Sequence, residues 1–127
     1  MKVAKILTSI LAIVLGLIAL RWIIYPELSA NSLGMIYLDG TGRNTQIRDF
    51  TAIFFSTSLF CCISLITKQY QWVLCSGLVF LIIALMSILA FYIHEAPLTY
   101  SSLIAELLFA SLAFYAAFIF KIKKNYK

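Results

Sequence analysis

Four long apolar runs dominate this sequence and leave little of the chain outside them. They cover residues from about 6–24, 50–66, 72–93 and 101–120. A helix needs ~20 mostly apolar residues to cross a bilayer, and each run meets or nearly meets that length. The sequence therefore predicts an all-α, four-transmembrane-helix bundle, built as a single integral membrane domain over residues 1–127.

The amino-acid composition favours a lipid environment. Hydrophobic residues make up 63% of the chain and charged residues only 12%, against roughly 25% charged in an ordinary soluble domain. The net charge of +5 comes mainly from lysines beside the apolar runs, and no aromatic and basic residues alternate as in proteins that grip nucleic acid. The sequence thus predicts the lipid bilayer as the partner and no nucleic acid.

The flanking lysines also predict an orientation. With four spans, the two termini and the connection near residue 68 share one side, which carries Lys2, Lys5, Lys68, Lys121, Lys123, Lys124 and Lys127. Because positive residues collect on the cytoplasmic side, we expect cytoplasmic N- and C-termini and one longer outer loop between the first two helices. Lys2 and Lys5 before an apolar run also resemble a signal peptide, but the run is long for one. We therefore expect an uncleaved first helix.

Glu106 is the polar residue that most needs explanation. It lies about two turns inside the fourth predicted span, with apolar neighbours on both sides. A carboxylate at such a depth costs a few kcal/mol. It shares a face with the small residues Ala105 and Ala110, so we expect it to face the bundle, either neutral or paired with a cation.

Several charged residues are expected at the same level as Glu106. Arg48 begins the second span and is the favoured partner, while Arg21 and His94 are alternatives. The candidate outer polar cluster or ligand site comprises Arg48, Glu106, His94, Glu95, Arg21 and Asp49. Three interpretations stay open: an Arg48–Glu106 pair that fixes helix register, a pocket for a ligand or lipid headgroup, and a path for protons or ions.

The sequence offers little for catalysis. His94 and Glu95 do not have the spacing of a metal site, and no Ser, His and Asp set is placed for nucleophilic attack. Cys61, Cys62 and Cys75 form no CxxC pair and lie inside apolar runs, where cysteine usually acts as a small packing residue. We therefore expect no metal, no cofactor and no enzymatic activity.

Several short motifs resemble a known bacterial membrane family. They are Leu33-Gly34, Asp39-Gly40, Ile47-Arg48 and Glu106. The pattern resembles the uncharacterised family catalogued as domain of unknown function 4345, which is similar to the DoxX-like four-helix membrane proteins. The resemblance spans nearly the whole chain and implies a multi-pass protein of the cell membrane, here the bacterial inner membrane. It carries over Arg48 and Glu106 but implies no reaction.

Three functions are compatible with these features. The first is an accessory or interaction subunit of a membrane assembly, bound to a membrane-protein partner or to further copies of itself. The second is a lipid- or quinone-binding module, by analogy with the DoxX-like proteins. The third is a small proton-linked transporter, although small multidrug transporters carry their carboxylate in the first helix. The sequence favours the first.

Overall fold

The computed structural model describes residues 1–125, and over that range the chain is built from helices and their connections. The elements are α1 (Lys2–Ile24), α2 (Pro26–Ser32), α3 (Gly40–Thr67), α4 (Tyr70–His94) and α5 (Tyr100–Asn125). The helices α1, α3, α4 and α5 are each long and apolar enough to cross a membrane. The predicted all-α fold with four apolar helices is therefore confirmed, whereas Lys127 lies outside the described residues.

The connection between α1 and α3 is more helical than hydropathy alone predicts. Pro26 opens the short helix α2, a position that suits proline because its fixed φ matches the helix and its missing N–H would have no partner there. The helix α3 begins at Gly40 rather than at Phe50. Its polar first turns are stabilised by side-chain hydrogen bonds and not by apolar residues, so a hydropathy pattern could not detect them.

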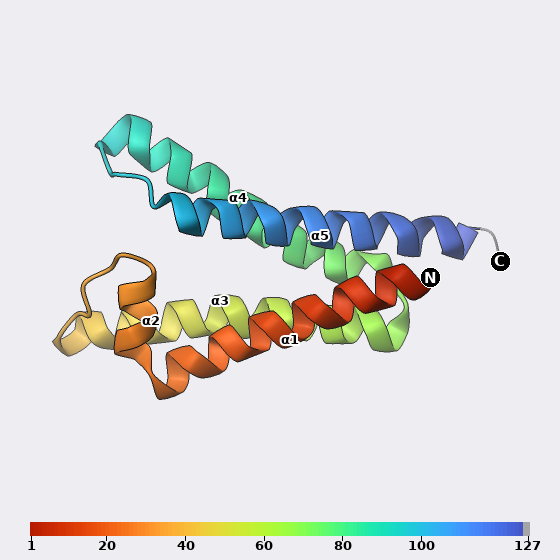
Figure 1. Ribbon diagram of the computed structural model, residues 1–127, viewed down its shortest axis with the longest axis horizontal. Helices are drawn as coiled ribbons and strands as arrows, with labels where there is room; N and C mark the ends of the chain where they lie inside the picture. Colours follow the sequence, from red (N-terminus) through yellow and green to blue (C-terminus); the bar gives the residue numbers. More distant parts are fainter. Residues whose placement is uncertain (126–127) are drawn as a thin grey trace.

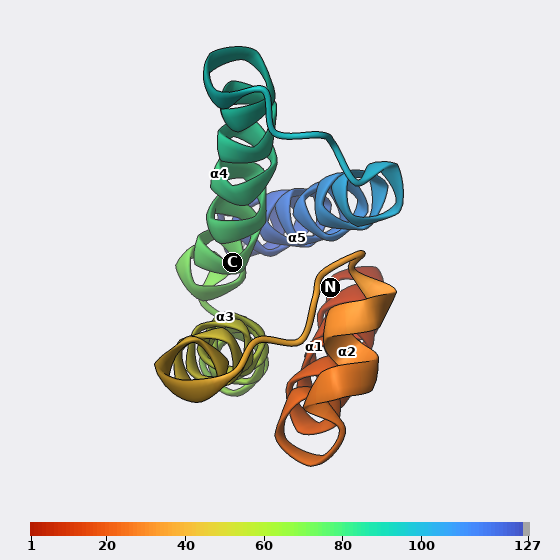
Figure 2. The ribbon, with the colours of Figure 1, turned by 90° about the vertical axis from the view of Figure 1, so that its left-hand side faces the viewer.

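The four long helices form two pairs. The helix α1 packs on α3 and α4 packs on α5, while α1–α5 and α3–α4 contacts join the pairs. Figure 1 shows both termini at one end of the bundle, which we call the terminal end, and the pairs separating toward the other end, which we call the distal end. Figure 2 looks onto the distal end and shows α2 beside α1, with α4 and α5 on the opposite side.

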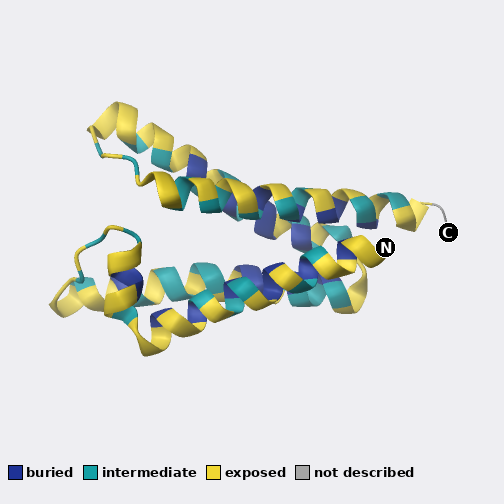
Figure 3. Ribbon diagram, in the orientation of Figure 1, coloured by how far each residue is buried: buried dark blue, intermediate teal, exposed yellow. Residues whose placement is uncertain are grey.

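The packed core occupies the terminal half and the middle of the bundle. Its members include Leu11 and Leu15 of α1, Cys61 of α3 and Phe120 of α5. In Figure 3 most buried segments lie along this part of the bundle, with others on α2 and the distal part of α1, whereas the distal part of α4 is exposed. Small residues permit close approach there: an added Cβ at Gly77 of α4 would lie 2.9 Å from the Phe114 ring of α5.

Two hydrogen bonds between helices fix the pairing within this core. Ser58 Oγ of α3 donates to the Ala12 carbonyl of α1 at 2.7 Å. Ser76 Oγ of α4 donates to the Thr57 carbonyl of α3 at 2.8 Å. Because hydroxyl groups in an apolar environment need partners, these bonds tie α3 to both of its neighbours at defined heights.

Candidate functional site

A cavity of about 400 Å³ lies between the two helix pairs, toward the distal end. All five helices contribute to its wall. The polar part of the wall consists of Arg21, Ser29, Ser32, Ser102 and Glu106. The larger apolar part includes Trp22, Phe50, Phe54, Phe80 and Phe109.

The cavity changes from polar to apolar along the helix axes. Ser102, Glu106 and Phe109 share one face of α5, because residues three and four apart are neighbours on a helix, and all three line the cavity. Glu106 lies six residues after Tyr100, which is about 9 Å along the axis at 1.5 Å per residue. On α1, Arg21 lies nearer the distal end than Ile18. On α5 the polar groups thus lie toward the distal end and Phe109 lies deeper, whereas on α1 the ring of Trp22 lies beside Arg21.

Aromatic rings form the deep part of the cavity wall. Phe80 of α4 is buried and contacts Phe109 of α5, with ring centroids 5.2 Å apart, and Phe54 of α3, at 6.1 Å. Nearer the distal end, Trp22 of α1 stacks on Phe50 of α3 with centroids 4.7 Å apart. The rings belong to helices of both pairs. Phe54, Phe80 and Phe109 form the deep end of the cavity, and Trp22 and Phe50 form its wall on the side of α1 and α3.

Glu106 contributes a carboxylate oxygen that has no protein partner. Its Oε2 atom is buried, and within residues 1–125 no side chain or backbone group donates a hydrogen bond to it. A buried polar atom without a partner is uncommon because it loses its hydration without compensation. This oxygen therefore marks the place in the cavity where a hydrogen-bond donor is missing.

The predicted Arg48–Glu106 pair is wrong. Arg48 Nε instead lies 3.0 Å from Oδ1 of Asp49, and both side chains are more than half exposed. Phe50 faces the cavity, and Arg48 lies two residues earlier, which is about 200° around the helix. Arg48 therefore points to the opposite side of α3, where it lines a shallow groove with Ile23 of α1.

The structure separates the other predicted cluster members as well. His94 and Glu95 are exposed at the end of α4 and do not line the cavity. Of the six predicted residues, Arg21 and Glu106 share the cavity, whereas Arg48, Asp49, His94 and Glu95 lie outside it. Arg21 is exposed, as expected for a long side chain that reaches from apolar surroundings toward a polar region.

Three cavity serines were not predicted. Ser102 precedes Glu106 by four residues, and this helical spacing could have identified it from the sequence. Ser29 and Ser32 lie on α2 and its end, and no sequence pattern indicated that this segment returns over the bundle. Ser29 Oγ donates to the Tyr25 carbonyl at 3.0 Å, and Ser32 Oγ donates to the Ser29 carbonyl at 2.7 Å. Their oxygens keep lone pairs for a further donor.

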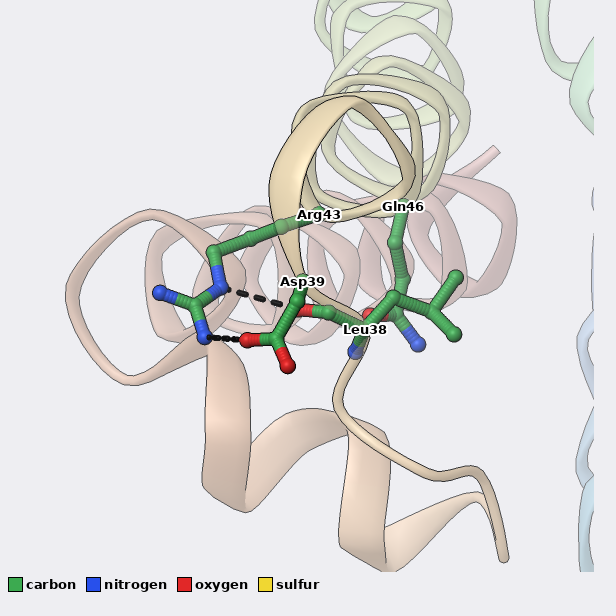
Figure 4. A network of polar contacts seen from close by, with 4 residues as sticks. All are labelled: Leu38, Asp39, Arg43 and Gln46. Atoms are coloured by element: carbon green, nitrogen blue, oxygen red, sulfur yellow. Dashed lines mark hydrogen bonds and ion pairs between the residues drawn. The ribbon is translucent and has the colours of Figure 1, made fainter.

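A polar network at the start of α3 holds the chain that follows α2 (Figure 4). Gln46, which is only 4% exposed, accepts a hydrogen bond from the Leu38 amide at 3.1 Å and donates to the Ile36 carbonyl at 3.2 Å. Arg43 pairs with Asp39 at 2.7 Å and donates to the Leu38 carbonyl at 2.9 Å. These bonds anchor residues 36–39 to α3 and so restrict the segment that carries Ser32 and Leu33 at the cavity.

The described residues show no grouping for metal binding. Within residues 1–125, no three His, Cys, Asp or Glu side chains lie close enough together to hold a metal ion. Cys61, Cys62 and Cys75 are free thiols, and none of them lines the cavity. The chemical features of the cavity are therefore those of one carboxylate, one guanidinium, three hydroxyl groups and an aromatic wall.

The fold defines the class of protein to which this chain belongs. Four long apolar helices with short connections give it the architecture of a small multi-pass membrane protein. No family model, curated protein or solved structure matches the chain. The resemblance to the domain of unknown function 4345 therefore stays a prediction.

Proposed function

We propose that this protein binds an amphipathic molecule in the cavity between its two helix pairs. The observation that supports this proposal best is the unpartnered, buried Oε2 of Glu106 in the polar part of an otherwise largely apolar cavity. A ligand with a polar head and an apolar tail would match the change of polarity along α5 and the guanidinium of Arg21. In a bilayer, molecules of this kind are abundant.

The size of the cavity supports an occupant. A volume of about 400 Å³ lies within the roughly 300–1,000 Å³ of small-molecule pockets. The cavity is open to its surroundings, so molecules of the bilayer can enter it, and its shape and polarity favour an amphipathic one.

The location of the protein is part of this proposal. The helix ends at the terminal end carry most of the lysines, namely Lys2, Lys5, Lys68, Lys121, Lys123 and Lys124. Because positive residues collect on the cytoplasmic side, this distribution supports cytoplasmic termini. The family resemblance supports the bacterial inner membrane. In that orientation, the cavity would lie toward the outer leaflet.

Native mass spectrometry of the protein, extracted gently from its own membrane, tests the proposal. We expect a defined small molecule bound to each chain. Ala105→Phe fills the cavity wall on α5 and should abolish that binding. Ala52→Phe adds the same side chain at an exposed position on α3, outside the cavity, and should leave the binding unchanged.

Two results would contradict ligand binding. The first is a chain that carries no small molecule but a stoichiometric protein partner, which would support the accessory-subunit hypothesis instead. The second is retention of the bound molecule by Ala105→Phe at the wild-type level, because a ligand in the cavity must compete with the added ring for the same space.

A further inference from the structure

We infer that the ligand is a phospholipid whose head carries a primary ammonium group beside its phosphate, as in phosphatidylethanolamine. The inference rests on the proposed function and concerns the polar part of the same cavity. There, Glu106 of α5 and Arg21 of α1 place a carboxyl group and a guanidinium on the wall of one cavity. Within residues 1–125, no ion pair joins the two.

The charges of the wall select a head that carries both signs. An anionic head would pair with Arg21 but would leave the Glu106 oxygen without a donor. A head with only a positive charge would satisfy Glu106 and leave Arg21 to solvent. A zwitterionic head satisfies both, because charge-assisted hydrogen bonds to a carboxylate and to a phosphate are the strong ones.

The hydrogen-bonding capacity of the wall selects the kind of cation. The hydroxyl protons of Ser29 and Ser32 already go to backbone carbonyls, so these two oxygens can only accept. Together with Oε2 of Glu106, they give the wall three acceptor oxygens for a cationic group, while the N–H donors of Arg21 are left for the phosphate. A primary ammonium supplies three N–H donors, whereas a quaternary choline group supplies none. The wall therefore favours ethanolamine over choline.

The apolar part of the cavity suits the acyl chains of such a lipid. It continues from the polar groups to the rings of Phe54, Phe80 and Phe109. A volume of about 400 Å³ suits one small-molecule ligand, whereas a phospholipid with two long acyl chains is larger than that. The head and the first part of the chains would lie inside, and the rest of the chains would extend into the bilayer.

A titration of the delipidated protein in detergent tests this inference. The probes are dioleoyl lipids with phosphoethanolamine, phosphocholine and phosphoglycerol heads, and native mass spectrometry measures their apparent Kd. We expect phosphoethanolamine to bind at least tenfold more tightly than either of the others. Glu106→Gln should reduce the preference over phosphocholine to less than threefold, and Arg21→Gln should weaken all three lipids.

Matched variants separate these effects from general loss of charge. Glu95→Gln and Arg48→Gln remove the same charges from exposed positions outside the cavity and should preserve the preference. Equal affinities for the three lipids in the wild type would overturn the inference while leaving the proposed function standing. No saturable binding of any amphiphile would overturn both. Helicity and the unfolding midpoint of each variant, measured by circular dichroism, verify that the fold is intact.

Discussion

Replacing Gly77 with alanine should loosen the contact between α4 and α5, because the added Cβ has no space. It would lie 2.9 and 3.0 Å from two ring carbons of Phe114 and 3.1 Å from Cβ of Ala113. Carbon atoms attract each other best at about 3.5–4.0 Å, so the ring or the helix must move by roughly half an ångström.

The expected loss follows from two opposing terms. Overpacking of a well-packed interior typically costs about 1–3 kcal/mol. Alanine recovers about 0.8–1.0 kcal/mol of helix propensity over glycine. We therefore expect Gly77→Ala to lower the free energy of unfolding by about 0–2 kcal/mol, with the helical content of the folded protein unchanged.

The assay is unfolding in mixed micelles by titration with sodium dodecyl sulfate, followed by far-UV circular dichroism. Gly42→Ala in the first turns of α3 is the control, since its added Cβ would meet Leu38 at an ordinary 3.4 Å. It should be neutral or slightly stabilising. The reasoning is refuted if Gly77→Ala is more stable than the wild type by the full propensity gain of about 0.8–1.0 kcal/mol, because the added Cβ would then meet no steric resistance. It is also refuted if Phe114→Leu costs as much in the Gly77→Ala variant as in the wild type, because a clash with the ring requires coupling between the two positions.

Three further changes test other parts of the structure with the same unfolding assay. Gln46→Leu removes two hydrogen bonds to the preceding backbone. It should lower the free energy of unfolding by about 1–3 kcal/mol and speed hydrogen exchange at the Leu38 amide. Unchanged exchange at that amide would argue against the network. Glu95→Gly should stabilise the protein by about 1 kcal/mol. Glu95 has φ 54°, and glycine adopts this left-handed conformation without the steric penalty of other residues. Glu95→Gln is the control and should have no effect. The effects of Arg48→Leu and Glu106→Leu on the free energy of unfolding should add in the double variant to within about 0.5 kcal/mol, because Arg48 pairs with Asp49. Strong coupling between the two changes would instead support an Arg48–Glu106 pair.

The sequence was sufficient to predict the fold class and the four apolar helices. The apolar composition and the length of a segment decide whether it can cross a bilayer, and both are visible in the sequence. It could not predict α2 or the first turns of α3, because those depend on contacts such as the two hydrogen bonds of Gln46 with residues 36 and 38. Local polarity made this region look like an irregular loop.

The candidate site was predicted only in part. Glu106 was found because a carboxylate in an apolar run is conspicuous, and its position on the bundle-facing side follows from helical spacing. The choice of cation failed because it required the rotation of α3 about its own axis. Arg48 was expected to face inward toward Glu106, whereas Phe50 and Phe54 line the cavity. Small differences in apolar character around a lipid-facing helix do not fix that rotation.

The separation of the helix pairs at the distal end is specified by the side chains of α5. In the terminal half, its buried face presents Ala110, Ala113, Ala116 and Ala117, and small residues let helices approach closely. Toward the distal end, the same helix presents Phe109, whose ring meets Phe80 at 5.2 Å, and then the carboxylate of Glu106. These groups are too large or too polar to pack against α1 as the alanines do. The cavity is therefore a consequence of the residues that line it, and a bound amphiphile would complete the packing that the four helices leave unfinished.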